Sequence, residues 1–321
     1  MEYRHLGRTG LKVSAICLGT MQFGWSADES TAHSIMNEAV DLGCNFFDTA
    51  DIYSSWVEGN PGGVSERIIG SWLAAGIVSR DKIVIATKVR GAMGQGPNDQ
   101  GLSRYHIMNG VEASLRRLQT DYIDLYQVHW PDEETPLEET MEALSDLVHS
   151  GKVRYIGCSN YPAWLLAKSL WVSDMKDLAR FETLQPHYNL VHRAEFEREL
   201  QPLCLDQKIG VIPYSPLAGG FLTGKYRRDT TLPDSDRAEG IRNRYMDEQG
   251  FSAVDKLAEI GRSHDATIAQ TAIAWILANP TVSSAIIGAN TVAQLRDTFK
   301  GADLELSAED VEALNATTAW K

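Results

Sequence analysis

Short apolar runs alternate with longer amphipathic runs along most of this chain. The short runs are continuously apolar, which is the pattern of strands that are covered on both faces. Eight such runs lie at 16–19, 45–48, 83–87, 122–128, 153–158, 181–184, 210–213 and 283–287. Strands that alternate with helices in this way predict a parallel sheet within an α/β fold.

The amphipathic runs carry the start signals of helices. In 103–118 apolar residues recur at helical spacing, and Ser103 stands at the N-cap position. A second helix is expected around 267–278, where an Asn-Pro pair stops it, and Asn290 has the type and position of the cap of the next helix. These helices fall between the predicted strands, as a β/α alternation requires.

The run at 135–149 shows signals at both of its ends. Thr135 and Glu138 have the spacing of a capping box, and Pro136 suits the first turn of a helix. Gly151 follows the run, and glycine commonly terminates helices because it adopts the left-handed conformation there. We therefore expect a well-bounded helix between the fourth and fifth strands.

Eight strand–helix units favour a (β/α)₈ TIM barrel, a fold of typically about 250 residues. The chain has 321 residues, which leaves room for additions. Gly7 and Gly10 predict a β-hairpin within the first fourteen residues, ahead of the barrel, and Ser307 starts an extra C-terminal helix. The composition does not shift along the chain, so we expect a single domain over 1–321.

The segment 219–250 stands apart because it is polar and rich in glycine. A segment of this length inside a compact domain is more often a functional lid than a plain connection. Because it follows a predicted strand end, we interpret it as a lid over a cofactor.

Composition narrows the classes of function. The net charge of −13 argues against a nucleic-acid binder, which would carry a basic face. No apolar run approaches the ~18 residues of a membrane span, and the N-terminus lacks the apolar region of a signal peptide. The four cysteines are widely spaced, which favours buried reduced thiols and a cytoplasmic location.

Polar residues follow directly after several of the apolar runs. In a (β/α)₈ barrel the carboxyl ends of the strands surround one mouth, where active sites are built. The residues at these positions are Asp48, Lys88, His129, Ser159, Asn160, Gln185, Tyr214 and Ser215. Each has an ordinary structural explanation by itself, such as capping a turn or filling a satisfied core position. Gathered at one end of the strands, they predict an active site.

The types of four residues indicate a reaction. A buried lysine beside an aspartate stays charged, so Asp48 is expected to hold Lys88. Lys88 is expected in turn to lower the pKa of Tyr53 from about 10, so that Tyr53 acts as general acid and base. His129 would orient a substrate oxygen. One acid with such a histidine suits carbonyl reduction by a hydride-donating cofactor, and we expect no metal.

Longer stretches resemble one known family, the aldo-keto reductases, over nearly the whole chain. The stretches include LGCNFFDTADIY (42–53), YIDLYQVHWPD (122–132), GKVRYIGCSNYP (151–162) and GVIPYSPLAGGFLTGKY (210–226). The resemblance implies a TIM barrel that uses NAD(P)H to reduce aldehydes or ketones reversibly. It also implies that the catalytic tetrad is Asp48, Tyr53, Lys88 and His129, which is the set chosen above from residue types.

The resemblance further implies how the cofactor is held. The cofactor-binding residues would be Thr20, Ser159, Asn160, Gln185, Tyr214, Ser215, Leu217, Gly219, Lys225, Arg227, Gly288 and Gln294. Among these, Ser159, Asn160 and Gln185 would hold the nicotinamide carboxamide, and the ring of Tyr214 would stack on the nicotinamide. Open backbone amides and basic side chains of 215–228 also favour a phosphate cradle there, with a solvated loop as the alternative.

The chain departs from the family near the adenosine end of the expected cofactor. Many relatives place an arginine or lysine close to the position of Asn290, where it grips the 2′-phosphate of NADP. They usually carry Glu-Asn where this chain has Asp297-Thr298. The resemblance implies NADP as the cofactor, but the neutral Asn290 and Gln294 predict only a modest preference, with NAD also usable.

Aromatic residues indicate the class of substrate. Trp25, Trp56 and Trp130 flank the predicted mouth, and aromatic walls favour apolar or ring-bearing carbonyl compounds. Core packing is the alternative for each tryptophan. The leading hypothesis is therefore a reductase of small carbonyl compounds. The alternative is a nucleotide-bound regulatory subunit of the potassium-channel β type, which would bind the cofactor and turn over very slowly.

Overall fold

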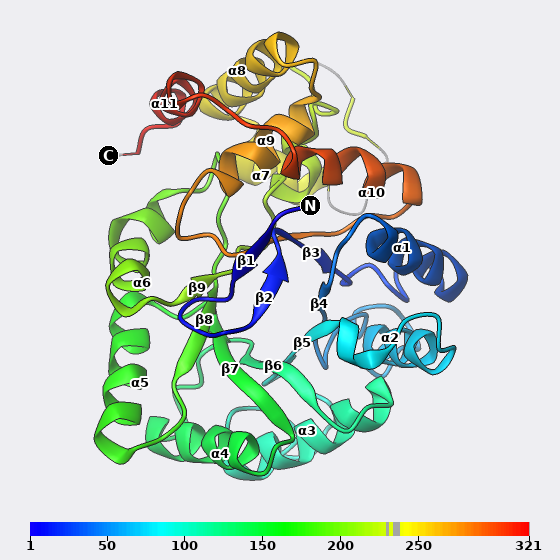
Figure 1. Ribbon diagram of the computed structural model, residues 1–321, viewed down its shortest axis with the longest axis vertical. Helices are drawn as coiled ribbons and strands as arrows, with labels where there is room; N and C mark the ends of the chain where they lie inside the picture. Colours follow the sequence, from blue (N-terminus) through cyan, green and yellow to red (C-terminus); the bar gives the residue numbers. More distant parts are fainter. Residues whose placement is uncertain (229–230, 234–237, 321) are drawn as a thin grey trace.

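The computed structural model describes residues 1–228, 231–233 and 238–320 and has the predicted (β/α)₈ architecture (Figure 1). Its eight parallel strands are ordered β10–β3–β4–β5–β6–β7–β8–β9, so neighbours in sequence are neighbours in the sheet. The strands are β3 (Ile16–Gly19), β4 (Phe46–Asp48), β5 (Val84–Val89), β6 (Ile123–Val128), β7 (Val153–Ser159), β8 (Phe181–Gln185), β9 (Gly210–Val211) and β10 (Ala285–Ile287). All eight predicted strands are confirmed, with bounds that shift by up to two residues.

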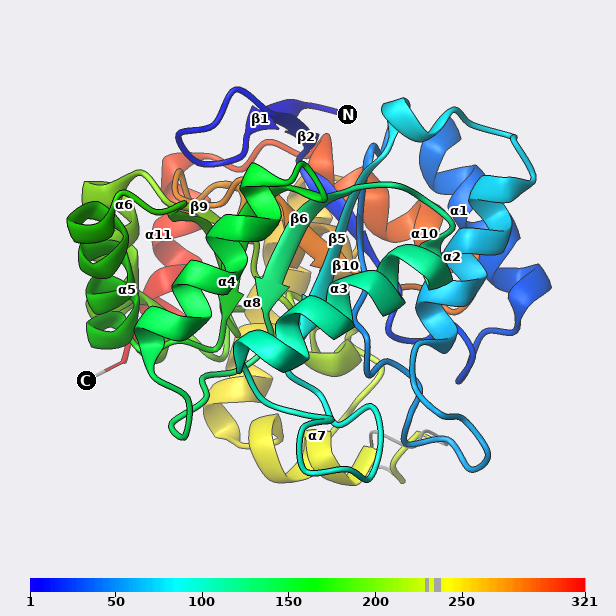
Figure 2. The same cartoon turned by 90° about the horizontal axis from the view of Figure 1, so that it is seen from below.

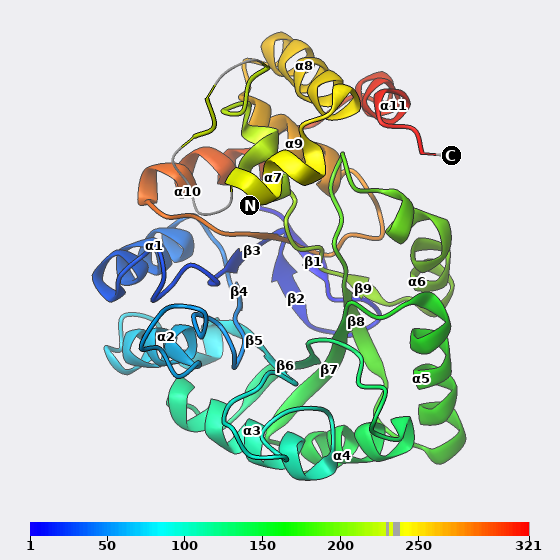
Figure 3. The same cartoon turned by 180° about the vertical axis from the view of Figure 1, so that it is seen from behind.

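Helices surround the sheet on its outer side (Figures 1 and 3). They are α1 (Glu29–Asp41), α2 (Val64–Ala74), α3 (Arg104–Leu118), α4 (Leu137–His149), α5 (Ala163–Lys176), α6 (Gln201–Gln207), α7 (Ala238–Tyr245), α8 (Glu248–Ser263), α9 (Ile268–Leu277), α10 (Val292–Phe299) and α11 (Ala308–Thr317). Among the described residues, none of these helices is both long and apolar enough to cross a membrane.

The edge strands β9 and β10 meet through single backbone hydrogen bonds rather than a regular ladder. Ser283 N donates to Val211 O at 2.8 Å, and Ile286 N donates to Pro213 O at 3.0 Å. These contacts close the sheet into a barrel. The strand predicted over 210–213 has only two residues in the sheet, because Pro213 has no N–H to continue the ladder.

The predicted hairpin is present as β1 (Tyr3–His5) and β2 (Lys12–Ser14), paired antiparallel. Its turn residue Gly7 has φ +61°, and a side chain there would approach Gly210 N to 2.6 Å. The turn therefore packs directly against the start of β9. Leu6 is fully buried among residues of the barrel interior, so the hairpin plugs the N-terminal end of the barrel. Figure 2 shows the hairpin and α7 at opposite ends of the molecule.

The predicted helix caps had different outcomes. Ser103 caps α3 as expected, since its hydroxyl accepts from His106 N at 3.2 Å. The capping box at Thr135 is wrong, because its hydroxyl donates to Asp132 at 2.8 Å instead of capping α4. The cap at Asn290 is also wrong by one residue, since the side chain of Thr291 caps α10.

The glycine-rich segment 219–250 contains more regular structure than a loop. A short helical stretch covers Ala218–Thr223, α7 covers Ala238–Tyr245, and α8 already begins at Glu248. Residues 229–230 and 234–237 of the predicted lid lie outside the described residues. The part that is described lies at the carboxyl ends of the strands.

The remaining predictions of local structure are confirmed. Ser307 caps α11, which is the expected additional C-terminal helix. Gly151 follows α4 with φ +75°, the left-handed value expected of a terminating glycine. All four cysteines are buried and free.

Candidate active site

A cavity of about 710 Å³ opens at the carboxyl ends of the strands. Most of the predicted site residues line it, namely Thr20, Asp48, Tyr53, Trp56, His129, Trp130, Ser159, Asn160, Gln185, Tyr214, Ser215, Leu217, Gly219, Lys225, Gly288 and Gln294. Lys88, Arg227 and Trp25 lie outside this lining. The fold thus brings residues from every part of the chain to one site.

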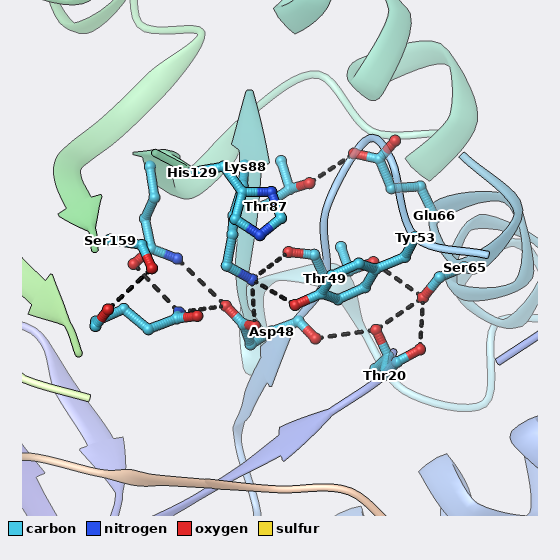
Figure 4. A network of polar contacts seen from close by, with 12 residues as sticks. Thr20, Asp48, Thr49, Tyr53, Ser65, Glu66, Thr87, Lys88, His129 and Ser159 are labelled. Carbon is cyan, nitrogen blue, oxygen red and sulfur yellow. Dashed lines mark hydrogen bonds and ion pairs between the residues drawn. The ribbon is translucent and has the colours of Figure 1, made fainter. Parts of the chain in front are cut away.

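Lys88 lies at the bottom of this cavity, on β5, with no exposed surface (Figure 4). Its Nζ donates to Asp48 Oδ1 at 2.5 Å, to the Thr49 carbonyl at 2.9 Å and to Tyr53 Oη at 3.0 Å. All three ammonium protons therefore have acceptors. Burial opposes the charge and is the largest single effect, but Asp48 and Tyr53 together outweigh it and raise the pKa of Lys88 above its usual value.

The second oxygen of Asp48 is held by two amides. Gln185 Nε2 donates to Asp48 Oδ2 at 2.9 Å, and Gln127 Nε2 donates to the same oxygen at 3.2 Å. The sequence analysis did not select Gln127. Its signal is a polar side chain within the otherwise apolar end of β6, a position that points into the barrel. Asp48 is thus fixed from two sides, and Gln185 has a structural contact besides its expected one to the cofactor.

Tyr53 lies between Lys88 and the open cavity. Burial raises the pKa of Tyr53 above its ordinary value, and the nearby Lys88 ammonium only partly opposes that rise. The prediction that Lys88 brings this pKa below 10 is therefore wrong, because desolvation of the phenolate is the larger effect. A neutral phenol at physiological pH has a proton to give. Lys88 already donates to its oxygen, so that proton is free to point toward a substrate.

His129 faces Tyr53 across the mouth, with ring centroids 5.9 Å apart. Burial, and then the charges of Lys88 and Arg90, hold the pKa of His129 well below its usual range, so the ring is neutral. Its Nδ1 has no hydrogen-bond partner among the described residues. The ring stacks on Trp130 at 3.7 Å, which fixes its plane. A neutral imidazole held in this way can form a hydrogen bond to a substrate oxygen.

A hydroxyl network anchors the connection after β4 that carries Tyr53 (Figure 4). The hydroxyl of Thr20 donates to the Asp48 carbonyl at 2.9 Å and lies 2.8 Å from that of Ser65. Ser65 also accepts from the Thr49 hydroxyl at 2.9 Å. Next to Ser65, Glu66 accepts from Thr87 on β5 at 2.6 Å. These contacts tie β3, β4, β5 and α2 together directly behind Tyr53.

The residues expected at the nicotinamide form a connected set. Asn160 Nδ2 donates to the His129 carbonyl at 2.9 Å, and its Oδ1 accepts from the Tyr214 hydroxyl at 2.9 Å. The Ser159 hydroxyl donates to the Gln185 carbonyl at 2.9 Å. Asn160 has φ +59°, a left-handed value that asparagine tolerates better than most residues. The ring of Tyr214 is therefore oriented by a bond to the strand-end residues.

The expected phosphate cradle has an unusual backbone. Ser215, Ala218, Gly219 and Gly220 have φ values of 56°, 50°, 69° and 104°. Repeated left-handed residues turn successive amides toward one side, which is how backbone nests bind anions. Lys225 also lines the cavity and adds positive charge. Two of the amides are already engaged, because Ala218 N donates to Ser215 O and Gly220 N donates to Leu217 O, each at 2.9 Å. The cradle therefore offers a pyrophosphate the Lys225 ammonium and only part of its backbone amides.

One of the two arginines of this cradle, Arg228, faces elsewhere. Arg228 pairs with Glu248 and Asp255 of α8, each at 2.9 Å. Its charge is therefore shared with carboxylates and is not directed at the cavity. Among the basic residues of the 215–228 cradle, Lys225 is the one that lines the cavity.

The end of the cavity where adenosine is expected is lined by the amides of Asn290 and Gln294 and by the acidic Asp297. Asn290 accepts from the Ser26 hydroxyl at 3.0 Å, and its backbone N–H donates to Gln294 at 2.9 Å. Arg296, the basic residue of α10, is held by both oxygens of Glu38 on α1 at 2.6 and 2.7 Å. Its guanidinium is thus engaged by α1, and Arg296 lies outside the cavity lining.

Two of the three predicted wall tryptophans line the cavity. Trp56 and Trp130 are both exposed at its mouth, with 47% and 38% of their surfaces accessible. Trp25 contacts Trp56 edge to face, with centroids 5.6 Å apart, and so supports the wall from behind. The mouth is therefore flat and aromatic on one side.

A parallel barrel with a lysine–aspartate pair, a tyrosine and a neutral histidine at its mouth has the architecture of an oxidoreductase. The chain belongs to the Aldo/keto reductase family, because the sequence model of that family matches residues 15–319. The match includes every strand and helix of the barrel and leaves out both strands of the N-terminal hairpin.

Individual relatives cover almost the full chain. It is 45% identical over 320 residues to an uncharacterized oxidoreductase, YrpG, of Bacillus subtilis, covering 98% of this chain and 95% of that protein. It is 35% identical to versiconal hemiacetal acetate reductase of Aspergillus parasiticus, covering 98% and 96%. It is also 38% identical to a probable voltage-gated potassium channel subunit beta of Arabidopsis thaliana, covering 95% and 92%. Family and relatives together support an oxidoreductase.

Proposed function

We propose that this protein reduces aldehydes or ketones with a nicotinamide cofactor and that Tyr53 is the proton donor. The observation that carries the proposal is the position of Lys88, whose ammonium donates to both Asp48 and Tyr53 beneath an open cavity. Burial keeps the phenol neutral, and the Lys88 ammonium stabilises the phenolate that forms when its proton leaves. This arrangement suits a general acid whose conjugate base must be tolerated in a buried place.

The cavity residues fit a nicotinamide dinucleotide from end to end. Asn160, Ser159 and Gln185 offer amide and hydroxyl groups near Tyr53, and Lys225 offers a positive charge farther along, beside the left-handed run at 215–220. When bound, the cofactor supplies the hydride. The chain supplies the rest: Tyr53 gives a proton to the substrate oxygen, and neutral His129 orients that oxygen. In the reverse direction Tyr53 takes the proton back.

The cofactor itself is proposed to be NADP, with NAD also accepted. Lys225 faces the cavity, but it would serve the pyrophosphate of either cofactor. At the adenosine end Asn290 and Gln294 are neutral, and Arg296 is engaged by Glu38. A charge-assisted contact contributes roughly 1.5–3 kcal/mol, so its absence predicts a small preference between the two cofactors.

The substrate is proposed to be a small apolar or ring-bearing carbonyl compound, because Trp56 and Trp130 form the exposed wall of the mouth. The four free buried thiols agree with a reducing compartment, which supports a cytoplasmic location.

One experiment separates this proposal from the channel-subunit alternative. NADPH and NADH binding would be measured by fluorescence titration, and turnover would be followed with a panel of aromatic and aliphatic aldehydes and ketones. We expect binding of both cofactors and turnover of at least one aromatic aldehyde at roughly 1 s⁻¹ or faster, the lower end of ordinary enzymes. Tight binding with turnover a hundredfold slower for every compound would instead favour a regulatory subunit.

A further inference from the structure

The ring of Tyr214 has a second ring behind it. Tyr214 lines the cavity, whereas His187 lies outside the lining. The two residues form an isolated parallel bridge just beyond the ends of β9 and β8. Their rings are nearly parallel, at 8°, with centroids 5.2 Å apart. His192 stacks on the far side of His187 with a centroid distance of 4.0 Å. Tyr214 is therefore the outermost member of a three-ring stack that faces the cavity.

His187 is also tied to the lid. The hydroxyl of Tyr245, the last residue of α7, lies 3.0 Å from His187 Nε2. Tyr245 is almost fully buried and packs on Phe221, whose segment contains the left-handed turn of the cradle. Asn189 adds a second link, because its Nδ2 donates to the Ser215 carbonyl at 3.0 Å and lies 3.4 Å from His187 Nε2.

The contact between His187 and Tyr245 does not depend on pH in the ordinary range, because neither side chain changes its charge there. Burial, and then the charges of His192 and Arg244, lower the pKa of His187 to about 3, so its ring stays neutral. Burial also raises the pKa of Tyr245, which keeps its hydroxyl protonated. A neutral imidazole nitrogen and a protonated phenol form a hydrogen bond that ordinary changes of pH leave intact.

We propose that His187 is a positioning residue for the cofactor-facing ring of Tyr214, and that its contact with Tyr245 couples the docking of α7 to nicotinamide cofactor binding. The inference rests on the proposed function, in which Tyr214 faces the nicotinamide. His187 fixes the plane of Tyr214 by stacking, while Asn160 fixes its hydroxyl end. Tyr245 fixes His187. Because coupling between two sites is reciprocal, the bound cofactor also stabilises the docked position of α7.

Two substitutions of His187 separate its two contacts. His187→Phe keeps a flat ring behind Tyr214 and removes the acceptor for Tyr245. His187→Gln keeps a hydrogen-bonding amide and removes the ring. Tyr245→Phe removes the same hydrogen bond from the side of α7, together with the contacts of its hydroxyl to Asn189 and Arg244, and leaves its packing on Phe221. Tyr188→Phe is the matched control, because Tyr188 is equally buried but donates to Glu197, outside the cavity lining.

The first readout is the dissociation rate constant of NADPH, measured by stopped-flow fluorescence. Tyr245→Phe and His187→Phe should each raise it about tenfold, the size expected for one buried hydrogen bond. The double variant should be no faster than either single one, because both remove the same contact. His187→Gln should also release NADPH faster, because Tyr214 loses its stacking partner. Tyr188→Phe should leave the rate unchanged.

The second readout needs no cofactor. Hydrogen exchange of the backbone amides of α7 in the cofactor-free protein should speed up in Tyr245→Phe and His187→Phe but not in Tyr188→Phe. Unchanged dissociation and exchange rates, or losses that simply add in the double variant, would overturn the inference. A wild-type protein that binds neither NADPH nor NADH would overturn the proposed function instead, and the exchange experiment would still test the contact between His187 and α7.

Discussion

The two ends of the cavity are built on different principles. At the catalytic end, Lys88 and Asp48 are buried, and every polar atom of the pair has a partner within the barrel. At the end where adenosine is expected, which we call the adenosine end, Asn290 and Gln294 are exposed, and the nearby Arg296 is bound to Glu38 on another helix. The catalytic end is preformed, because its residues lie on strands that are hydrogen-bonded to one another. The second end consists of surface side chains at the start of one helix.

This difference predicts where the protein tolerates change. A substitution at the catalytic end removes one member of a closed network, so it affects both the reaction and the fold. A substitution at the adenosine end changes a surface contact, so it alters cofactor choice and leaves the fold intact. The predictions below test the two ends in order of expected effect.

The largest loss of activity is expected at Tyr53. Tyr53→Phe removes the proton donor and one of the three acceptors of the Lys88 ammonium. General acid catalysis contributes typically ~10²–10⁴-fold. We expect kcat for aldehyde reduction to fall within that range, while the dissociation constant of NADPH, measured by fluorescence titration, stays within about twofold. A variant that keeps more than a tenth of the wild-type kcat would show that another group donates the proton.

Lys88→Met should affect the reaction and the stability together. It leaves the buried Asp48 carboxylate without its cation, a change that costs about 3–5 kcal/mol in buried pairs. The Lys88 charge lowers the raised pKa of Tyr53, so its loss raises that pKa further. Alcohol oxidation requires the phenolate, so the rising limb of its pH profile should move to higher pH.

The double variant Asp48→Asn/Lys88→Met is the control for this prediction. It removes both charges, so the double variant should regain most of the stability that Lys88→Met loses, as measured by thermal unfolding. Its activity should stay low. A Lys88→Met enzyme with an unchanged pH profile and a high residual rate would mean that the pair only supports the fold.

The catalytic end was predictable because its residues follow apolar strands. The carboxyl ends of the strands in a parallel barrel all meet at one mouth, so the gathering of Asp48, Lys88 and His129 could be predicted from position and residue type. The pKa of Tyr53 was not predictable, because its direction depends on how burial compares with the Lys88 charge. Gln127 was missed because it lies within a strand rather than after it, although its polarity is visible in the sequence.

The remaining features depend on contacts between distant segments. Thr135 has the spacing of a cap, but Asp132 competes for its hydroxyl in the folded chain. The helix α7 was not predicted, because it lies in a polar, glycine-rich stretch and only a few of its residues, such as Tyr245, make apolar contacts. His187 carries no sequence signal at all, since its neighbours Tyr214 and Tyr245 are 27 and 58 positions away in the chain. Only the folded barrel stacks these rings.

The smallest effect is expected at the adenosine end. Asn290→Arg places a cation where the 2′-phosphate of NADPH is expected, at the cost of one exposed hydrogen bond from Ser26. A 2′-phosphate carries close to two negative charges, and an exposed contact to it is partly screened by solvent. We expect the NADPH:NADH ratio of kcat/KM to widen by about tenfold, the equivalent of ~1.4 kcal/mol.

Asn290→Gln is the matched control for this last prediction. It lengthens the side chain and disturbs the Ser26 contact in the same way, but it adds no charge, so the ratio should stay at the wild-type value. Melting temperatures of both variants should match the wild type, because Asn290 is exposed. A wild-type enzyme that already prefers NADPH by several thousandfold, or an unchanged ratio in Asn290→Arg, would place the 2′-phosphate away from α10. In that case Lys225, the cradle lysine that lines the cavity, becomes the group to substitute next.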